Sequence, residues 1–147
     1  MKKIPSLFRR GSNGGLKNLN NSYGCIKTGA DFLSFGANGY LNFYLDDKSS
    51  EEEIEKCRSH IMKVLKSTGF LNLPNDCGIA ISLIDEAYIN PNSNNLVITS
   101  IAEGKALFFA KPDDYSDMEA LLDEVHNALM NLSDGKKATV DWQAYAV

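Results

Sequence analysis

The sequence predicts an α+β protein, a two-layer sandwich in which two helices cover a mainly antiparallel sheet. Hairpin signals at 31–45 and 95–110 indicate antiparallel strand pairing. Amphipathic segments with N-terminal capping signals at 50–68 and 116–132 indicate two helices. The expected order of elements is β-β-α-β-β-β-α-β, and hairpins combined with helices favour the α+β class.

The first hairpin consists of two short runs, 31–35 and 40–45, on either side of Gly36-Ala-Asn-Gly39. The Asn-Gly pair supplies residues that accept positive φ, as a tight hairpin turn requires. Tyr40 and Tyr44 then point to the same face of the second strand, since side chains alternate along a strand.

The first helix, 50–68, has Ser50 and Glu53 in the spacing of a capping box. Its apolar residues recur at intervals of three and four and form one stripe, and Gly69 is suited to end it. The second helix, 116–132, begins with the same capping spacing at Ser116 and Glu119. Both helices are therefore expected to cover the sheet with one apolar face.

Three further strands complete the expected order. The apolar run 78–84 predicts a central strand, 95–102 and 105–110 predict a second hairpin, and 138–145 alternates in the manner of a final strand. Two helices cover only one face of such a sheet. The other face is expected to be solvated, covered by the leader, or covered by a partner, including a second copy in a homodimer.

The chain is predicted to consist of a leader, 1–22, and one domain, 23–147. Residues 9–24 are rich in Gly, Asn and Ser, which is typical of a loop or flexible arm. Residues 1–30 carry six basic and no acidic side chains, whereas 31–147 carry nine basic and 19 acidic, a net charge of −10. A basic arm of this kind would serve as a nucleic-acid hook or as a strap across the acidic surface of the protein itself.

The composition predicts a cytoplasmic protein. The N-terminal stretch lacks the apolar run of a signal peptide, and no run reaches the roughly 18 apolar residues of a membrane helix. Three cysteines, Cys25, Cys57 and Cys77, fit reduced thiols better than a disulfide framework.

An acidic body would attract a basic protein by electrostatic steering, and exposed tyrosines would supply binding hot spots. By size and charge the chain is similar to the immunity proteins that neutralise bacterial nuclease toxins. We therefore expect a protein-binding module, a stoichiometric inhibitor of a basic partner. The expected contact residues are Tyr40, Tyr44, Asp46, Asp47, Asp85, Glu86, Asp113 and Asp114.

Two alternatives remain open. Nucleic acid would contact the basic leader, although the negative body repels the same polymer. The phosphate contacts would then be Lys2, Lys3, Arg9, Arg10 and Lys17. A pocket between sheet and helices would instead hold a small molecule, as in an enzyme or a ligand carrier.

The sequence contains no metalloprotease motif, nucleophile elbow, P-loop or dinucleotide fingerprint. Its two histidines, His60 and His126, lie on the flanks of the predicted helices, where a histidine is usually solvated. The Cys57 and His60 spacing has no second ligand pair to complete a zinc site. We therefore expect no catalysis, no metal and no cofactor.

Overall fold

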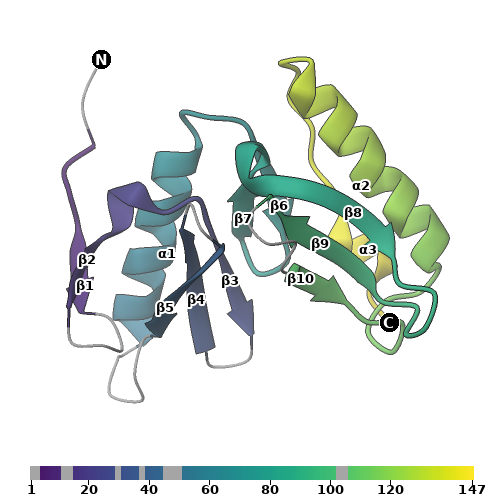
Figure 1. Ribbon diagram of the computed structural model, residues 1–147, viewed down its shortest axis with the longest axis horizontal. Helices are drawn as coiled ribbons and strands as arrows, with labels where there is room; N and C mark the ends of the chain where they lie inside the picture. The colour runs from purple at the N-terminus through teal and green to yellow at the C-terminus, as the bar shows by residue number, and fades with distance from the viewer. Residues whose placement is uncertain (1–3, 11–14, 29–30, 37–38, 45–50, 102–105) are drawn as a thin grey trace.

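The computed structural model describes residues 4–10, 15–28, 31–36, 39–44, 51–101 and 106–147. A five-stranded antiparallel sheet has the order β5-β4-β3-β7-β6. Its strands are β3 (Gly24–Thr28), β4 (Asp31–Gly36), β5 (Gly39–Tyr44), β6 (Phe70–Leu73) and β7 (Cys77–Ala80). Helix α1 (Glu51–Leu65) packs on one face, against β3 and β7 (Figure 1).

A three-stranded antiparallel sheet follows, with the order β10-β9-β8. Its strands are β8 (Ile84–Ile89), β9 (Leu96–Ser100) and β10 (Ala106–Ala110). Helix α2 (Met118–Ser133) packs against β8, and the short helix α3 (Trp142–Tyr145) ends the chain. The 3-10 turn η2 (Ile81–Leu83) joins β7 of the first sheet to β8 of the second.

The α+β class, with antiparallel sheets and helices, is confirmed, while the expected strand order matches only roughly. Both predicted hairpins form, and both predicted helices bury one stripe, which consists of Cys57, Ile61 and Leu65 in α1 and of Leu121, Val125 and Ala128 in α2. The strands β3 and β6 were not expected. The predicted strand 78–84 divides into the end of β7, the turn η2 and the start of β8.

The prediction of a final strand over 138–145 is wrong. Residues 138–141 are extended without a strand partner, and Asp141 then begins a helical turn by accepting a hydrogen bond from the Ala144 N–H. Alternation of apolar and polar residues over so short a run does not separate a strand from a capped turn. The N-cap of α2 is likewise Asp117, in place of Ser116. Ser50, the other expected cap, lies outside the described residues.

Much of the expected loop at 9–24 has regular structure. Strands β1 (Phe8–Arg10) and β2 (Leu16–Asn18) form a ribbon, and the 3-10 turn η1 (Leu19–Asn21) packs on α1. Leu19 is 1% exposed and belongs to the hydrophobic core. One buried leucine therefore fixes this segment onto the rest of the molecule, a contact that polar composition alone does not reveal.

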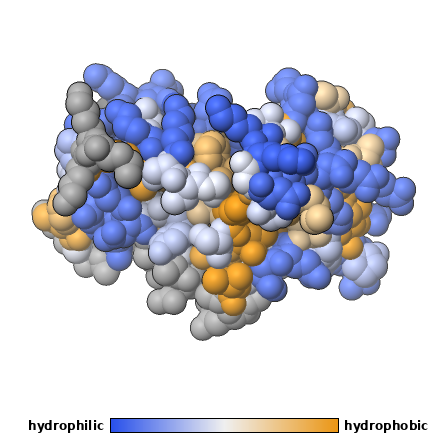
Figure 2. Space-filling view, turned by 90° about the horizontal axis from the view of Figure 1, so that it is seen from above, coloured by the Kyte–Doolittle hydropathy of each residue, from blue (hydrophilic) through white to orange (hydrophobic). Residues whose placement is uncertain are grey.

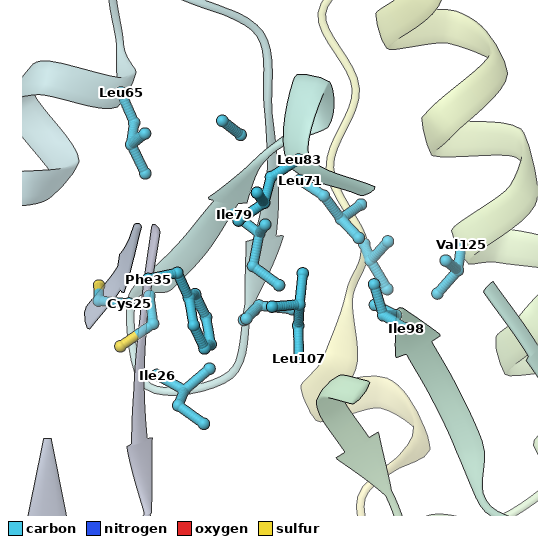
Figure 3. Packing of buried hydrophobic residues seen from close by; sticks show 14 of the residues in the cluster. Cys25, Ile26, Phe35, Leu65, Leu71, Ile79, Leu83, Ile98, Leu107 and Val125 are labelled. Atoms are coloured by element: carbon cyan, nitrogen blue, oxygen red, sulfur yellow. The ribbon is translucent and has the colours of Figure 1, made fainter. Parts of the chain in front are cut away.

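The core runs through both sheets. Gly24, Phe35 and Ile79 lie opposite one another in the first sheet, so they share the face turned away from α1. Figure 3 shows Ile79 and Phe35 on one side of Leu107, with Ile98 and Val125 beyond it. The second sheet therefore buries part of the face that the sequence leaves without a predicted cover.

Close packing of β3 against β7 depends on glycine. A Cβ on Gly24 would lie 2.6 Å from the Gly78 carbonyl oxygen, which no real side chain tolerates. Seen from above, hydrophobic surface gathers near the middle of the molecule, with hydrophilic surface toward both ends (Figure 2). Exposed apolar side chains also occur away from the middle, among them Phe8 and Leu16 in β1 and β2 and Met130 in α2.

Candidate functional site

The C-terminal segment is held against β6 by one side chain. The Asn72 side-chain amide donates to the Val140 carbonyl at 2.8 Å, and its oxygen accepts from the Val140 N–H at 2.7 Å. The indole N–H of Trp142 donates to the Asn72 carbonyl at 2.8 Å. These three bonds fix the approach to α3 as a neighbouring strand would.

Trp142 is the centre of an aromatic group. Its ring meets Phe108 at a centroid distance of 5.3 Å and Tyr115 at 6.0 Å, both edge to face. Such pairs contribute about 0.5–1.5 kcal/mol beyond their buried area. Trp142 is 5% exposed, whereas Tyr115 is only partly buried, so the group reaches the surface at Tyr115.

The last residues of the chain return to the segment after β10. The Ser116 N–H donates to the Tyr145 carbonyl at 2.7 Å, and the Val147 N–H donates to the Asp114 carbonyl at 3.0 Å. Between these bonds, Tyr115 pairs with Ala146 in an isolated antiparallel bridge. The turn that carries Asp114 is therefore fastened to α3.

A cleft of about 360 Å³ lies beside α3, between the β6–β7 turn and the C-terminal segment. We call it the C-terminal cleft. The residues that line it are Asn72, Pro74, Asn75, Tyr115, Val140, Asp141, Trp142, Gln143 and Ala146. Asp141 is the one charged residue among them, so the cleft combines aromatic walls with a carboxylate.

Further carboxylates lie close to two tyrosines at this end of the molecule, Tyr115 in the cleft and Tyr145 in α3. Partial burial raises the pKa of Tyr145, and the negative charges of Glu124, Asp117, Asp141 and Asp123 raise it further. The pKa of Tyr115 is raised by burial and then by the charge of Asp114. We refer to these carboxylates as the acidic rim, which consists of Asp114, Asp117, Asp123, Glu124 and Asp141.

The acidic rim belongs to an acidic segment of the chain, and one of its members, Asp141, lines the cleft. Residues 111–147 contain eight acidic and three basic side chains, a net charge of −5. The Glu124 carboxylate accepts a hydrogen bond from the Asp141 N–H at 3.3 Å, which joins α2 to α3. A site with this charge and with tyrosines at its surface is suited to a cation, either lysine or arginine.

The structure brings only some of the residues predicted from the sequence to this place. Asp113 and Asp114 are exposed in the turn after β10, and Asp114 belongs to the acidic rim. Asp85 and Glu86 are exposed at the start of β8, next to the end of β9, whereas Asp113 follows the end of β10 that pairs with the start of β9. The two acidic pairs therefore lie at opposite ends of the second sheet.

The remaining predicted contact residues lie elsewhere. Tyr40 and Tyr44 belong to β5, at one edge of the five-stranded sheet, and Asp46 and Asp47 lie outside the described residues. Nothing brings β5 together with the C-terminal cleft, since β5 is at the far side of the molecule in Figure 1.

The residues of the alternative nucleic-acid site lie at the N-terminal end of the molecule. Arg9 forms an ion pair with Glu53 of α1, so this basic side chain of the leader lies against an acidic residue of the body. Arg10 and Lys17 belong to the β1–β2 ribbon, and Lys17 lines a separate cavity. Lys2 and Lys3 lie outside the described residues.

Sequence reasoning missed Tyr115, Asp141, Trp142 and Tyr145 as site residues. The interpretation of 138–145 as a strand placed Asp141 and Tyr145 on one face of a sheet and Trp142 on the other. One signal was present, because an Asp directly before Trp142 is a common helix N-cap. Two features beyond the sequence made the cleft, the Asn72 clamp and the return of the chain to Asp114.

Among the described residues, no group of three or more His, Cys, Asp and Glu side chains is arranged to hold a metal ion. The described helices include none with the length and apolar character needed to cross a membrane. Comparison of the chain with protein-family models, with curated proteins and with solved structures finds no significant match.

Proposed function

We propose that this protein is a protein-binding module whose C-terminal cleft receives a lysine or arginine side chain of a basic partner. The observation that carries the proposal is the combination, in one cleft, of Tyr115, Trp142 and Asp141, with further carboxylates close to Tyr115 and Tyr145. A cation over an aromatic ring gains roughly 0.5–2 kcal/mol, more where water is excluded.

The support is both local and long-range. The three hydrogen bonds of Asn72 and the α3 cap hold the walls of the cleft before a partner arrives, which lowers the entropic cost of binding. The net charge of −5 over residues 111–147 would speed the encounter with a basic protein, by roughly 10–1,000-fold at low salt.

We further propose that binding inhibits the partner with one-to-one stoichiometry, as immunity proteins do for bacterial nuclease toxins. A nuclease presents a basic surface to the phosphates of its substrate, and the acidic rim would compete for that surface. The three cysteines are free thiols, in keeping with action in the reducing cytoplasm.

The experiment compares two double variants with the same loss of charge. Asp114→Asn with Asp123→Asn removes two carboxylates of the acidic rim, and Asp85→Asn with Glu86→Gln removes two exposed carboxylates at the other end of the second sheet. A partner is first isolated from the source cells by its elution in a salt gradient, then purified and titrated with each protein.

The rim variant is expected to bind at least tenfold more weakly than the parent, while the control variant keeps the parent affinity. Activity of the partner should fall linearly with added parent protein and reach its minimum at one molar equivalent. Equal affinities for the two variants would overturn the assignment of the cleft. Full partner activity in the bound complex would overturn inhibition.

A further inference from the structure

A second cavity lies at the opposite end of the molecule, between the N-terminal segment and α1. It measures about 540 Å³, and we call it the α1 groove. Its lining residues are Ile4, Pro5, Ser6, Leu7, Lys56, Ser59, His60 and Lys63. The volume is within the range of small-molecule sites, roughly 300–1,000 Å³.

The α1 groove contains positive charge and no carboxylate. Lys56 and Lys63 are two helical turns apart and so lie on the same side of α1, with His60 between them. Among the glutamates of α1, Glu53 pairs with Arg9 and Glu55 pairs with Arg58. Glu52 and Glu53 line a neighbouring cavity together with Lys56. Within the described residues, no carboxylate is close enough to Lys56 or Lys63 for an ion pair.

The hydrogen bonds of Asn20 determine which nitrogen of His60 carries a proton. The Asn20 side-chain amide donates to the Ile4 carbonyl at 3.0 Å, so its oxygen is the atom that faces His60. That oxygen lies 2.5 Å from His60 Nε2, which must therefore be the N–H donor. Nδ1 remains as the basic nitrogen of a ring whose position is fixed.

The positive side chains of the α1 groove have no negative group among its lining residues. Burial and the positive charge of Lys63 lower the pKa of His60. The titratable groups that face His60 come from α1, namely Lys56 and Lys63, because residues 4–7 and 19–21 contribute none. An anion in the groove would offset the repulsion from Lys63 and favour protonation of Nδ1.

We propose that the α1 groove binds the phosphoryl group of a small phosphorylated molecule, held by Lys56 and Lys63 and assisted by the Ser59 hydroxyl and His60. Residues 4–7 line one side of the groove, and its volume of about 540 Å³ would hold a ligand of the size of a mononucleotide. This site is independent of the C-terminal cleft, since the two lie at opposite ends of the molecule (Figure 1).

Calorimetric titrations with inorganic phosphate, AMP and adenosine, at constant ionic strength in sodium chloride, test the proposal. Phosphate and AMP are expected to bind, and adenosine is not. Tighter binding of AMP than of phosphate would identify a nucleotide as the ligand class, and equal affinities would identify free phosphate. Binding of adenosine as tight as that of AMP, or no binding of either anion, would overturn the proposal.

Matched variants locate the site. Lys56→Gln and Lys63→Gln should each weaken AMP binding about tenfold, because each removes one charge-assisted contact. Lys66→Gln, an equal change at an exposed position just beyond α1, should leave the affinity unchanged. The His60 ring resonances should also titrate at higher pH when AMP is bound. An equal loss for Lys66→Gln, or an unshifted His60 titration, would overturn the site.

Discussion

Asn72 and Val140 are joined by two hydrogen bonds, of 2.8 and 2.7 Å, although 68 residues separate them in the chain. The side-chain amide of Asn72 donates to the carbonyl of Val140 and accepts from its N–H, as the backbone of a neighbouring strand would. These two hydrogen bonds position the chain after Val140, including Trp142 and the walls of the C-terminal cleft.

Replacement of Asn72 by Ala should destabilise the protein by about 2–4 kcal/mol, because it leaves a partly buried N–H and carbonyl without partners. Chemical denaturation followed by fluorescence of Trp142, the one tryptophan of the chain, measures the change. Asn127→Ala, on the exposed side of α2, is the control and should change stability by less than about 0.5 kcal/mol. A decrease in the free energy of unfolding of less than about 1 kcal/mol for Asn72→Ala would contradict a stabilising role of the Asn72 and Val140 hydrogen bonds.

The N-cap of α2 gives a second prediction. Asp117 has φ of 48° and ψ of 68°, in the left-handed region, and its carboxylate accepts from the Ala120 N–H. Asp117→Ala should cost about 1–3 kcal/mol, since it removes the cap together with the short polar side chain that makes the left-handed region more accessible to Asp and Asn than to Ala. Asp117→Asn retains both features and should cost less than about 0.5 kcal/mol, as thermal unfolding of the two variants would establish.

The pH dependence of stability follows from His60. Because burial and Lys63 lower its pKa below the usual 6.5, the unfolded chain binds this proton more readily than the folded protein does. Stability should therefore be constant with respect to this group above about pH 7 and should fall as the pH drops through 6.5. Urea denaturation in buffers without phosphate measures the slope.

Two histidine variants separate this effect from the titration of carboxylates. His60→Gln retains a donor for the Asn20 oxygen and should reduce the loss of stability between pH 7 and pH 5.5. His126→Gln, at the histidine that faces the Ala87 carbonyl, should retain the His60 contribution. An unchanged slope in His60→Gln would contradict the assignment.

The reactivity of the cysteines is a further outcome to measure. The neighbouring Cys25 thiol and the positive charge of Arg58 lower the pKa of Cys77, while the neighbouring Cys77 thiol and burial raise the pKa of Cys25. Burial raises the pKa of Cys57. All three thiols are buried, so a reagent reaches them only when the structure opens locally. Among them we expect Cys77 to be alkylated first near pH 8, because its pKa is lowered and the thiolate is the reactive form.

Mass spectrometry of the alkylated peptides gives the order of modification. Arg58→Gln should slow the reaction at Cys77, whereas Lys66→Gln, at an exposed lysine, should not. Modification of Cys25 or Cys57 ahead of Cys77 in the parent protein would contradict the proposed thiol pairing.

The sequence predicts the local elements of this fold better than their arrangement. Periodicity located α1 and α2, because each buries one stripe, and the turn residues located both hairpins. Periodicity cannot show that η2 divides one apolar run between two sheets, or that Leu19 anchors a polar segment, since both depend on contacts between distant residues.

The candidate site was predicted only in part. Charge indicated a surface for a basic partner and Asp114 as one of its residues, because net charge and exposed turns are visible in the sequence. The cleft itself depends on Asn72, whose partner Val140 lies in another part of the chain. The sequence offers no local signal for a side chain that replaces a strand.

The turn η2 also affects how cooperatively the two sheets unfold. Its first residue, Ile81, donates its N–H to the Gly69 carbonyl ahead of β6, and the carbonyl of Leu83 accepts from the Ile101 N–H after β9. Leu83 is buried in the core that both sheets share. Because η2 is bonded to a segment beside each sheet and Leu83 lies in their shared core, loss of structure in one sheet should weaken the support of the other. Amide hydrogen exchange in the slowest strands of the two sheets should therefore report a single cooperative opening.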